Sequence, residues 1–367
     1  DGAASIYRCP SSLNPEVVKK LRDYSLLAVN ALQLRSCARL DFKVTADDSV
    51  YLYDVIPVPD MDRNSPIFAA ARHSGFSPEE IFDLICNKAA KEIKAETVQK
   101  ETAKAYKNVA LKVGLTYNMK RLDPKIHGDR EAEYDPPKTL DAIASAISSF
   151  GHTVVMLETN ETLPQNMAES DVDIVFNIAE GFSGRTREAQ VPALCDLCGI
   201  PHTGSDATTL AITMDKALTK DLLIRNGIAT PQYQLFRSAK DKLDPNMKFP
   251  LIVKPNAEGS SKGITQNSVV YNEDMLRENV KQQIFQYNQP VLVEQYITGR
   301  EFTVGLLHVD SLKALPPLEV VFLRTDISHP VYSFEIKQEW DMNVRYDCPA
   351  QIDKKLERTL SLAAKKA

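Results

Sequence analysis

The residues best suited to chemistry stand in 254–263, KPNAEGSSKG, directly after the apolar run 249–253. An apolar strand would deliver Lys254 at its end, and the glycines and serines that follow could place backbone N–H groups and hydroxyls around a polyanion. The stretch has neither the Gly-x-x-x-x-Gly-Lys-[Ser/Thr] nor the Gly-x-Gly-x-x-Gly pattern, which excludes a Walker loop and a Rossmann fingerprint. It predicts a phosphate site, although a lysine that closes a solvated strand is, on this pattern alone, the commoner interpretation.

Two carboxylates stand on the arms of a predicted hairpin near the N-terminus. Residues 38–44 and 50–55 alternate as two strands do, and the turn-like residues 46–49 join them. Asp41 lies on one arm and Asp54 on the other, so the pair could share a Mg²⁺ ion, which prefers oxygen ligands and bridging phosphates. The pattern fits equally well with carboxylates that only solvate the outside of a hairpin.

A third group of polar residues follows a predicted strand in the middle of the chain. Residues 109–117, 153–157 and 173–177 are apolar runs typical of buried strands, and 140–147 has helical apolar spacing. This alternation predicts a parallel sheet with both faces covered. Ligands collect at the carboxyl ends of such strands, where residues 178–188 are dense in charge and glycine. That loop either faces a substrate or begins a polar helix with local ion pairs.

The remaining elements place further lysines and carboxylates. Apolar spacing predicts helices over 17–35, 206–226 and 274–286. The strand 290–296 carries Glu294, and the strand that starts at Gly299 carries Glu301 beyond a short turn. Residues 86–107 mix both signs of charge, which predicts a solvated linker helix without a binding role.

The composition is that of an ordinary globular protein, with 43% apolar and 25% charged residues among 367. A net charge of −5 gives no reason to expect nucleic acid or an anionic membrane as a partner. No apolar run approaches the roughly 20 residues of a spanning helix, and no leader-like segment opens the chain, so a cytoplasmic location is expected. Cys195 and Cys198 have C-x-x-C spacing without a second ligand pair, and we expect buried thiols at a helix end.

Two distant segments resemble each other. Tyr7-Arg8-Cys9-Pro10, followed by Leu13, Leu21 and Ala28, recurs as Tyr346-Asp347-Cys348-Pro349, followed by Ile352, Leu356 and Ala363. Such self-similarity predicts two copies of one module. Because the chain runs from Asp1 to Ala367, inside a predicted helix, we expect the first copy to lack its beginning and the natural protein to continue beyond the second. The alternative is that the N-terminal segment packs onto the second copy as a permuted replacement.

Eight short motifs follow one another along the chain: Gly199-Ile200-Pro201-His202-Thr203-Gly204-Ser205, Met214-Asp215-Lys216, Val253-Lys254-Pro255, Glu258-Gly259-Ser260-Ser261, Glu294-Gln295-Tyr296, Gly299-Arg300-Glu301-Phe302-Thr303, Phe334-Glu335-Ile336-Lys337 and Tyr346-Asp347-Cys348-Pro349. In this order and spacing they resemble the D-alanine–D-alanine ligase family of the ATP-grasp superfamily. The resemblance implies a parallel α/β domain followed by an ATP-grasp α+β domain. The boundaries it suggests are 1–95 for a partial first copy, 96–107 for the linker helix, 108–230 for the α/β domain, and 231–367 for an ATP-grasp domain truncated at its C-terminal end.

The resemblance also implies ATP and Mg²⁺ as cofactors and assigns roles by position. The residues implied at the phosphates are Lys216, Lys254 and Lys337, with Ser260 and Ser261 in a mobile glycine-rich loop above them. Those implied around adenine and ribose are Glu294, Gln295, Ile297 and Glu301. In the N-terminal copy, Arg39 would stabilise an oxyanion and, with Ser260, act in catalysis, while Asp41 and Asp54 would bind the metal.

The family reaction is amide bond formation driven by ATP. A substrate carboxylate takes the γ-phosphate, and an amine attacks the resulting acylphosphate. Because phosphoryl transfer depends on positioning and on neutralising charge, several lysines and a carboxylate-bound metal are the expected parts. A loop that closes over the site keeps water from the acylphosphate.

The chain departs from the family at the metal and substrate positions. Asp54-Val55-Ile56-Pro57 stands where the family has Glu-x-Asn-Pro, so a ligating amide has become isoleucine. The loop 114–120 lacks the glutamate that meets the first D-alanine, Ile178-Ala179-Glu180-Gly181 replaces Leu-His-Gly, and Gln338 stands where the ligases often have tyrosine. ATP handling therefore matches the family, whereas D-alanine recognition does not.

The sequence thus predicts an ATP-dependent carboxylate–amine ligase that acts on small amino-acid-like substrates, and the family suggests a homodimer. A catalytically impaired ATP-binding or regulatory module is the rival hypothesis, motivated by Ile56 and by the lack of a metal hairpin after residue 349. A third hypothesis is an ATP-grasp enzyme with another acceptor, such as a carbamoyl or carboxyl transfer system.

Overall fold

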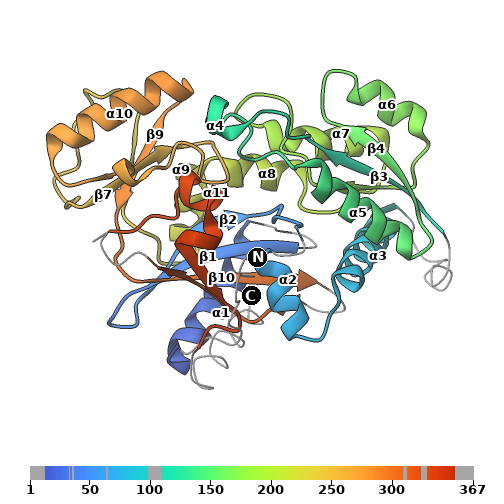
Figure 1. Ribbon diagram of the computed structural model, residues 1–367, viewed down its shortest axis with the longest axis horizontal. Coiled ribbons are helices and arrows are strands. Elements are labelled where there is room, and N and C mark those ends of the chain that lie inside the picture. Colours follow the sequence, from blue (N-terminus) through green and yellow to red (C-terminus); the bar gives the residue numbers. More distant parts are fainter. Residues whose placement is uncertain are drawn as a thin grey trace.

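The computed structural model describes residues 13–32, 34, 37–62, 65–97, 110–308, 312–323 and 329–351. Three sheets organise these described residues (Figure 1): a parallel sheet at the upper right, a four-stranded antiparallel sheet at the upper left, and a six-stranded antiparallel sheet below both. The predicted mixed α/β class with a parallel sheet is confirmed. Residues 1–12, which include Tyr7-Arg8-Cys9-Pro10 of the repeat, the linker residues 98–107 and the residues after 351 lie outside the described residues.

The parallel sheet has the strand order β4–β3–β5, with β3 over Lys112–Tyr117, β4 over Thr153–Glu158 and β5 over Ile174–Asn177. Side chains alternate between its faces. Ile174 and Phe176 pack in the cluster that holds helix α5 (Pro137–Ser149), whereas Val175 packs in the cluster that holds α6 (Leu163–Ser170) and α7 (Gln190–Cys198). Helices therefore cover both faces, as predicted.

The four-stranded sheet carries Lys254 and Glu294. Its order is β6–β9–β7–β8, and its strands are β6 (Tyr233–Phe236), β7 (Leu251–Pro255), β8 (Val269–Val270) and β9 (Val291–Gln295). Helix α10 (Glu273–Tyr287) covers one face through Leu276 and Val280, which pack with Leu251 and Val253. The predicted strands at 249–253 and 290–296 and the predicted helix at 274–286 are confirmed within one or two residues.

The six-stranded sheet contains strands from two distant parts of the sequence, residues 37–56 and residues 300–347. The N-terminal hairpin of β1 (Cys37–Val44) and β2 (Val50–Ile56) pairs through β1 with β10 (Arg300–His308). The strands β11 (Leu312–Ala314), β12 (Leu318–Phe322) and β13 (Val344–Asp347) complete the order β13–β12–β10–β1–β2, with β11 beside β10. Residues 37–56 thus form part of the sheet built by residues 300–347.

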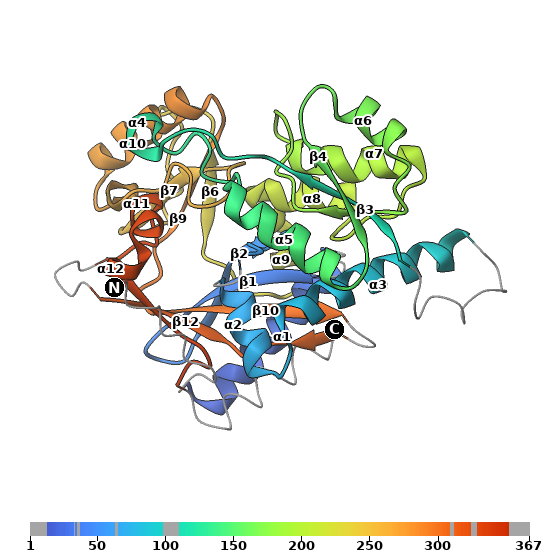
Figure 2. The same cartoon turned by 45° about the vertical axis from the view of Figure 1, so that its right-hand side comes forward.

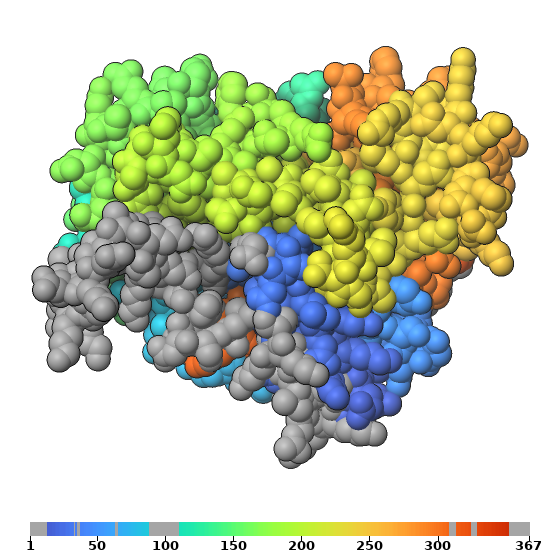
Figure 3. All heavy atoms as spheres, turned by 180° about the vertical axis from the view of Figure 1, so that it is seen from behind, coloured from blue at the N-terminus to red at the C-terminus, as the bar shows by residue number. Residues whose placement is uncertain are grey.

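Hydrophobic packing holds the hairpin in this sheet. Phe42 stands opposite Phe302 in the antiparallel register, and both side chains are fully buried. Burying a phenylalanine stabilises a fold by about 1.5–3 kcal/mol. Helix α1 (Pro15–Ala31) covers this face, ending four residues earlier than predicted. The N-terminal segment also lies against the segment after residue 206, which is drawn yellow-green to yellow in Figure 3. The Thr209 hydroxyl of that segment donates to the Leu32 carbonyl at 2.8 Å.

Helices α2 (Pro66–His73) and α3 (Pro78–Thr97) lie between the six-stranded and the parallel sheets, as the rotated view in Figure 2 shows. The rings of Phe68, Phe82 and Phe176 stack in sequence, with centroid distances of 5.4 and 5.5 Å. One phenylalanine comes from α2, one from α3 and one from β5. These rings connect the core of the N-terminal segment to the core of the parallel sheet.

The single helix predicted over 206–226 is wrong. Two helices occupy this range, α8 (Ala207–Met214) and α9 (Lys216–Arg225). Asp215 separates them because it adopts an extended conformation and its carboxylate accepts the Leu218 N–H at 3.1 Å, which makes it the N-cap of α9. The break places Lys216 at the first position of a helix.

Short elements complete the description: α4 (Pro124–His127), the 3-10 turns Arg187–Ala189 and Gln266–Ser268, α11 (Phe334–Gln338) and α12 (Trp340–Asn343). The C-x-x-C pair lies at the end of α7, and Gly199 caps this helix with a positive φ, as predicted. Cys195 is buried, but Cys198 is exposed, so the expectation of two buried thiols is wrong for Cys198. The second thiol points away from the core face of an amphipathic helix.

None of the helices that the structure describes combines the length and the apolar character that crossing a bilayer requires.

Candidate functional site

A cavity of about 510 Å³ lies where the three sheets meet. Hairpin strand β2, the segment before α5, the loop after β5, the start of α9, the glycine-rich loop and α11 all contribute to its wall. The charged residues that line it are Arg39, Asp54, Asp60, Asp62, Lys120, Glu133, Asp135, Glu180, Glu188, Lys216, Glu258 and Lys337. Ser260 lines it as well. The structure therefore brings together five residues of the sequence prediction: Arg39, Asp54, Lys216, Ser260 and Lys337.

Lys216 reaches this cavity from the first turn of α9. Its backbone N–H donates to the Asn256 carbonyl at 3.0 Å, and its ammonium donates to the Glu258 carbonyl. Asn256 in turn donates to Asp215 at 2.8 Å, so helix cap and glycine-rich loop are tied together. Removal from solvent lowers the pKa of Lys216, although Asp54 opposes this shift.

Lys254 lies beside the cavity, in a buried ion-pair group on the four-stranded sheet. Its ammonium is 2.5 Å from Glu294 Oε1, and Lys220 contacts Glu294 Oε2 at 2.7 Å. All three side chains are buried. Burial alone would raise the pKa of Glu294, but the two lysines bring it below its usual value. Such a group holds one net positive charge.

Sequence reasoning missed Lys220. The available signal was its spacing of four residues from Lys216, which places both on one face of α9. Lys220 also donates to the Thr230 hydroxyl at 2.7 Å.

The residues expected around adenine and ribose lie along β9, β10 and the turn between them. Glu301 accepts from Lys43 at 2.5 Å and from the Tyr53 hydroxyl, so residues of the N-terminal hairpin hold this carboxylate. Gln295 is exposed, and its N–H donates to the Gln232 carbonyl at 2.8 Å. Ile297 is half-buried in the turn. Glu294, Gln295, Ile297 and Glu301 do not line the 510 Å³ cavity, whereas Lys216, Ser260 and Lys337, which were expected at the phosphates, do.

The glycine-rich loop adopts a left-handed backbone at two serines. Ser260 has φ +46° and Ser261 has φ +59°. Non-glycine residues rarely adopt this conformation, and it is concentrated at functional loops. The Ser261 hydroxyl donates to the Tyr332 carbonyl at 2.8 Å, whereas Ser260 is exposed toward the cavity. The loop thus lies over the cavity and is attached to the chain before α11.

Arg39 and Lys337 form the basic wall of the cavity. The Arg39 Nη2 atom is 2.6 Å from Asp41 Oδ2, and its Nε donates to Oδ1 at 3.0 Å. Removal from solvent, together with the charge of Arg39, lowers the pKa of Lys337 to about 8. Lys337 lies over the Tyr332 ring, 5.5 Å from its centroid. This wall suits an anionic group.

The two expected metal ligands face each other across the hairpin, Asp41 opposite Asp54, as predicted. Asp41 is buried, and its carboxylate is occupied by Arg39 and by the Thr303 hydroxyl. Asp54 lines the cavity. Mg²⁺ usually keeps several waters and takes one or two carboxylates together with substrate phosphates. Asp54 fits that description as it stands, whereas Asp41 would first have to leave Arg39.

Another part of the cavity wall is acidic. Carboxylate oxygens of Glu133, Glu180 and Glu188 lie within 4.8 Å of one another. Burial and the neighbouring carboxylates raise the pKa of Glu188 to about 7 and that of Glu180 well above its usual range. Arg187 is ion-paired with Glu133 at 2.7 Å. Sequence reasoning singled out the loop 178–188 but missed Glu133, which no local pattern distinguishes.

Side chains at the carboxyl ends of the parallel strands hold this acidic loop. Asn118, directly after β3, donates to the carbonyls of Thr159 and Gly181 at 3.2 and 3.1 Å. Its Oδ1 accepts the Glu180 N–H at 2.9 Å. The loop 178–188, for which a substrate-facing position and a polar helix start were both left open, is therefore fixed at the edge of the sheet.

The family model described as D-ala D-ala ligase C-terminus matches residues 1–87 and 222–367. Both parts of this divided match contribute strands to the six-stranded sheet. The match leaves out residues 88–221, which hold the parallel sheet and helix α8.

Individual proteins agree with this match. An uncharacterized protein, y4sG, of Sinorhizobium fredii is 32% identical over 229 residues, which cover 60% of this chain and 66% of the relative. A D-alanine–D-alanine ligase of Aquifex aeolicus is 34% identical over 201 residues, 54% of this chain and 64% of the relative. The chain thus spans just under two thirds of the length of these relatives.

Among solved structures, the VanG D-Ala:D-Ser ligase of Enterococcus faecalis has a similar fold. The TM-score is 0.51 at 19% identity, and the likeness covers 70% of this chain and 81% of that chain.

Proposed function

Because the chain belongs to the D-alanine–D-alanine ligase family of ATP-grasp proteins, we propose that it is an ATP-dependent ligase that joins a carboxylate to an amine. The observation that carries the proposal is the convergence of Lys216, Lys337, Arg39 and the glycine-rich loop on one cavity, beside the buried Lys254 and Glu294. Phosphoryl transfer needs such a set of fixed cations and a loop that excludes water.

The proposed first step is transfer of the γ-phosphoryl group. A substrate carboxylate oxygen attacks the γ-phosphorus, the bond to the β–γ bridging oxygen breaks, and ADP leaves. Lys216, Lys254 and Lys337 neutralise phosphate charge, and the loop around Ser260 covers the acylphosphate. Bound Mg²⁺ would neutralise further charge on the phosphate oxygens, and Asp54 would hold it.

The proposed second step is attack of an unprotonated amine on the acyl carbon. The C–N bond forms, the acyl C–O bond breaks, and phosphate and one proton are released. The Arg39 guanidinium, on the cavity wall, stabilises the negative oxygen of the tetrahedral intermediate. Asp41 orients this guanidinium through two contacts, at 2.6 and 3.0 Å.

The substrates we propose are small and amino-acid-like. The cavity has a basic wall at Arg39 and Lys337 and an acidic wall at Glu180 and Glu188, so it can hold a carboxylate and an ammonium group on one molecule. The acidic residues come from the loop after β5, not from the loop 114–120.

A second candidate function is ATP binding without catalysis. It is favoured by Ile56, which contributes no oxygen at the third metal position, and by the ion pair that occupies Asp41. In that case the protein would bind nucleotide through the same lysines and turn over no substrate.

The test is phosphate release from ATP and Mg²⁺ across a panel of L- and D-amino acids, with ADP binding measured in parallel. We expect at least one amino acid to stimulate release, and Lys254→Ala to reduce it by about 100-fold or more. The matched control is Lys248→Ala, which removes an exposed lysine six residues away. ADP binding without stimulated release would favour the second function, and absence of both would overturn the nucleotide site.

A further inference from the structure

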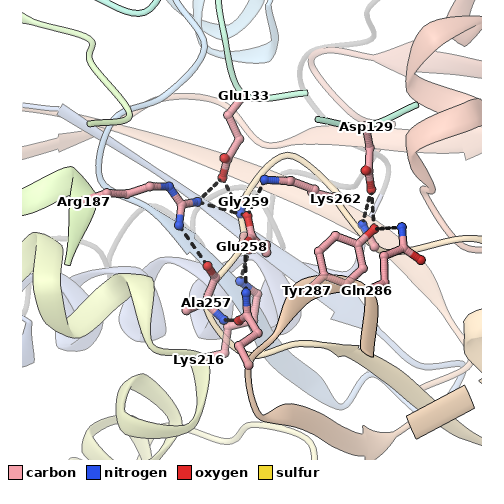
Figure 4. A network of polar contacts seen from close by, with 12 residues as sticks. Asp129, Glu133, Arg187, Lys216, Ala257, Glu258, Gly259, Lys262, Gln286 and Tyr287 are labelled. Carbon is pink, nitrogen blue, oxygen red and sulfur yellow. Dashed lines mark hydrogen bonds and ion pairs between the residues drawn. The ribbon is translucent and has the colours of Figure 1, made fainter. Parts of the chain in front are cut away.

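Two acidic side chains of the segment before α5 contact the glycine-rich loop (Figure 4). The Gly259 N–H donates to Glu133 Oε1 at 2.6 Å, and the Gly263 N–H donates to Asp129 Oδ2 at 2.7 Å. These N–H groups belong to the stretch that the proposed function reserves for phosphate oxygens. Each carries one hydrogen, so the same N–H does not fully serve a carboxylate and a phosphate together.

The contact at Glu133 is part of a buried charged network. Arg187 donates to Glu133 at 2.7 Å, to the Ala257 carbonyl at 3.0 Å and to Glu258 at 3.3 Å. The Glu133 side chain is 4% exposed. Figure 4 shows Glu133 and Arg187 reaching the loop from two other parts of the chain. Charge-assisted hydrogen bonds out of solvent are among the stronger ones in proteins.

The contact at Asp129 connects the glycine-rich loop to α10, the helix that covers the four-stranded sheet. Tyr287, the last residue of α10, donates its hydroxyl to the same Asp129 oxygen at 2.6 Å. Asp129 therefore links the loop at Gly263, helix α10 and the segment before α5 in one cluster (Figure 4).

The lysines expected at the phosphates are likewise bound within the chain. Lys216 donates to the Glu258 carbonyl, and Lys254 is paired with Glu294. With the N–H groups of Gly259 and Gly263, four donors suited to phosphate oxygens contact oxygens of the chain itself. A nucleotide that binds the two N–H groups has to replace their carboxylate partners, whereas each ammonium has three hydrogens and can donate to phosphate beside its present partner.

We propose that Asp129 and Glu133 form an autoinhibitory latch, in which their carboxylates occupy phosphate-oxygen positions on the glycine-rich loop and compete with the nucleotide. The latch rests on the proposed function, since it takes the loop as the phosphate-binding element. A bound triphosphate beside these carboxylates would be repelled, so latch and nucleotide exclude each other. Because Glu133 also lines the cavity, nucleotide entry moves part of the substrate wall.

The first test measures ADP binding, with Mg²⁺, to the full chain and its variants by calorimetry. Glu133→Gln and Asp129→Asn each weaken a charge-assisted contact, so ADP should bind about tenfold more tightly to either variant. The matched control is Glu131→Gln, which removes the same charge from the same segment. Glu131 accepts the backbone N–H groups of Arg121 and Leu122, at 2.6 and 2.7 Å, so ADP affinity should be unchanged in this variant.

A second variant removes the contact without changing charge. A Cβ at Gly259 would stand 2.7 Å from Glu133 Oε1, and Gly259 has no positive φ that alanine would strain. Gly259→Ala should therefore displace the flexible carboxylate and also tighten ADP binding. In the empty protein, hydrogen exchange of the amides in 256–263 should be slow for wild type and faster for Glu133→Gln.

Three results decide the inference. Tighter ADP binding in the variants, with faster loop exchange, supports the latch. Normal ADP binding to wild type with unchanged or weaker binding to Glu133→Gln and Gly259→Ala would overturn the latch and leave the ligase proposal intact. Absence of ADP binding in wild type and every variant would overturn the proposed function, and the latch with it.

Discussion

The buried carboxylates at the two ends of the site have neighbours of opposite charge. At the end that we propose to bind nucleotide, Glu294 lies between Lys220 and Lys254, so one carboxylate faces two cations. At the other end, Glu133, Glu180 and Glu188 lie within 4.8 Å of one another, and the ion pair of Arg187 is with the first of them.

Under the proposed function, this difference suits the two ends to different parts of the reaction. Excess positive charge lowers the pKa of Glu294 below its usual value and prepares its surroundings for a polyanion. Burial and, after it, the neighbouring carboxylates raise the pKa of Glu188, and these carboxylates disfavour a second polyanion there. The acidic end suits a neutral or cationic group, such as the amine that the proposed ligase would use.

Substitution of Lys220, at the cationic end, should cause the largest loss in the free energy of unfolding. Lys220→Met leaves Glu294 with Lys254 as its remaining ion-pair partner, and a buried carboxylate oxygen that loses its donor destabilises a protein by about 3 kcal/mol. Urea unfolding monitored by circular dichroism measures this loss. Lys240→Met, at an exposed position of the same domain, is the control and should change stability little. A loss below about 1 kcal/mol for Lys220→Met would mean that Lys254 alone compensates Glu294.

A neutral substitution of Glu188 tests the acidic end through the pH dependence of the free energy of unfolding. The raised folded-state pKa, about 7, means that the folded protein favours the neutral carboxyl. Its contribution to stability is present below the ordinary pKa and is lost as the pH rises toward and through 7. Glutamine mimics the neutral form, so the free energy of unfolding of Glu188→Gln should match that of wild type near pH 4.5 and exceed it by about 3 kcal/mol at pH 8.

The pH dependence of unfolding by urea checks this expectation, with Glu161→Gln at an exposed position as the control. An equal difference between Glu188→Gln and wild type at both pH values would contradict it, because only a titrating group makes the difference depend on pH.

The sequence predicted the parts of this site that local patterns encode. Period-two alternation identified the hairpin and placed Asp41 and Asp54 on its two arms. A register shift between Asp41 and Phe42, which the turn does not encode, brings the two aspartates opposite each other. The lysine at the end of β7 and the glycine-rich loop after it were recognisable from residue type and order. The helix break at Asp215 was missed, although the Met214-Asp215-Lys216 motif contains an N-cap residue.

The long-range parts were not predictable from local patterns. The pairing of β1 with β10 joins Asp41 to Thr303, and no local preference selects a partner so far along the chain. The sequence left two arrangements open for the N-terminal segment, and the described structure has the hairpin in the C-terminal sheet. Glu133 and Asp129 reach the loop through a segment with little regular structure, so no periodicity marks them.

The smallest expected effect concerns Lys337, on the basic wall. Its pKa of about 8 means that it loses its charge as the pH rises from 7 to 9, and phosphate oxygens bind the charged form better. ADP affinity should therefore fall over this range, by up to about tenfold, the change in the charged fraction. Arginine keeps its charge throughout, so Lys337→Arg should bind ADP with a flatter pH profile, measured by calorimetry at constant ionic strength. An identical fall in both proteins would assign the dependence to another group and remove Lys337 from the phosphate-binding set.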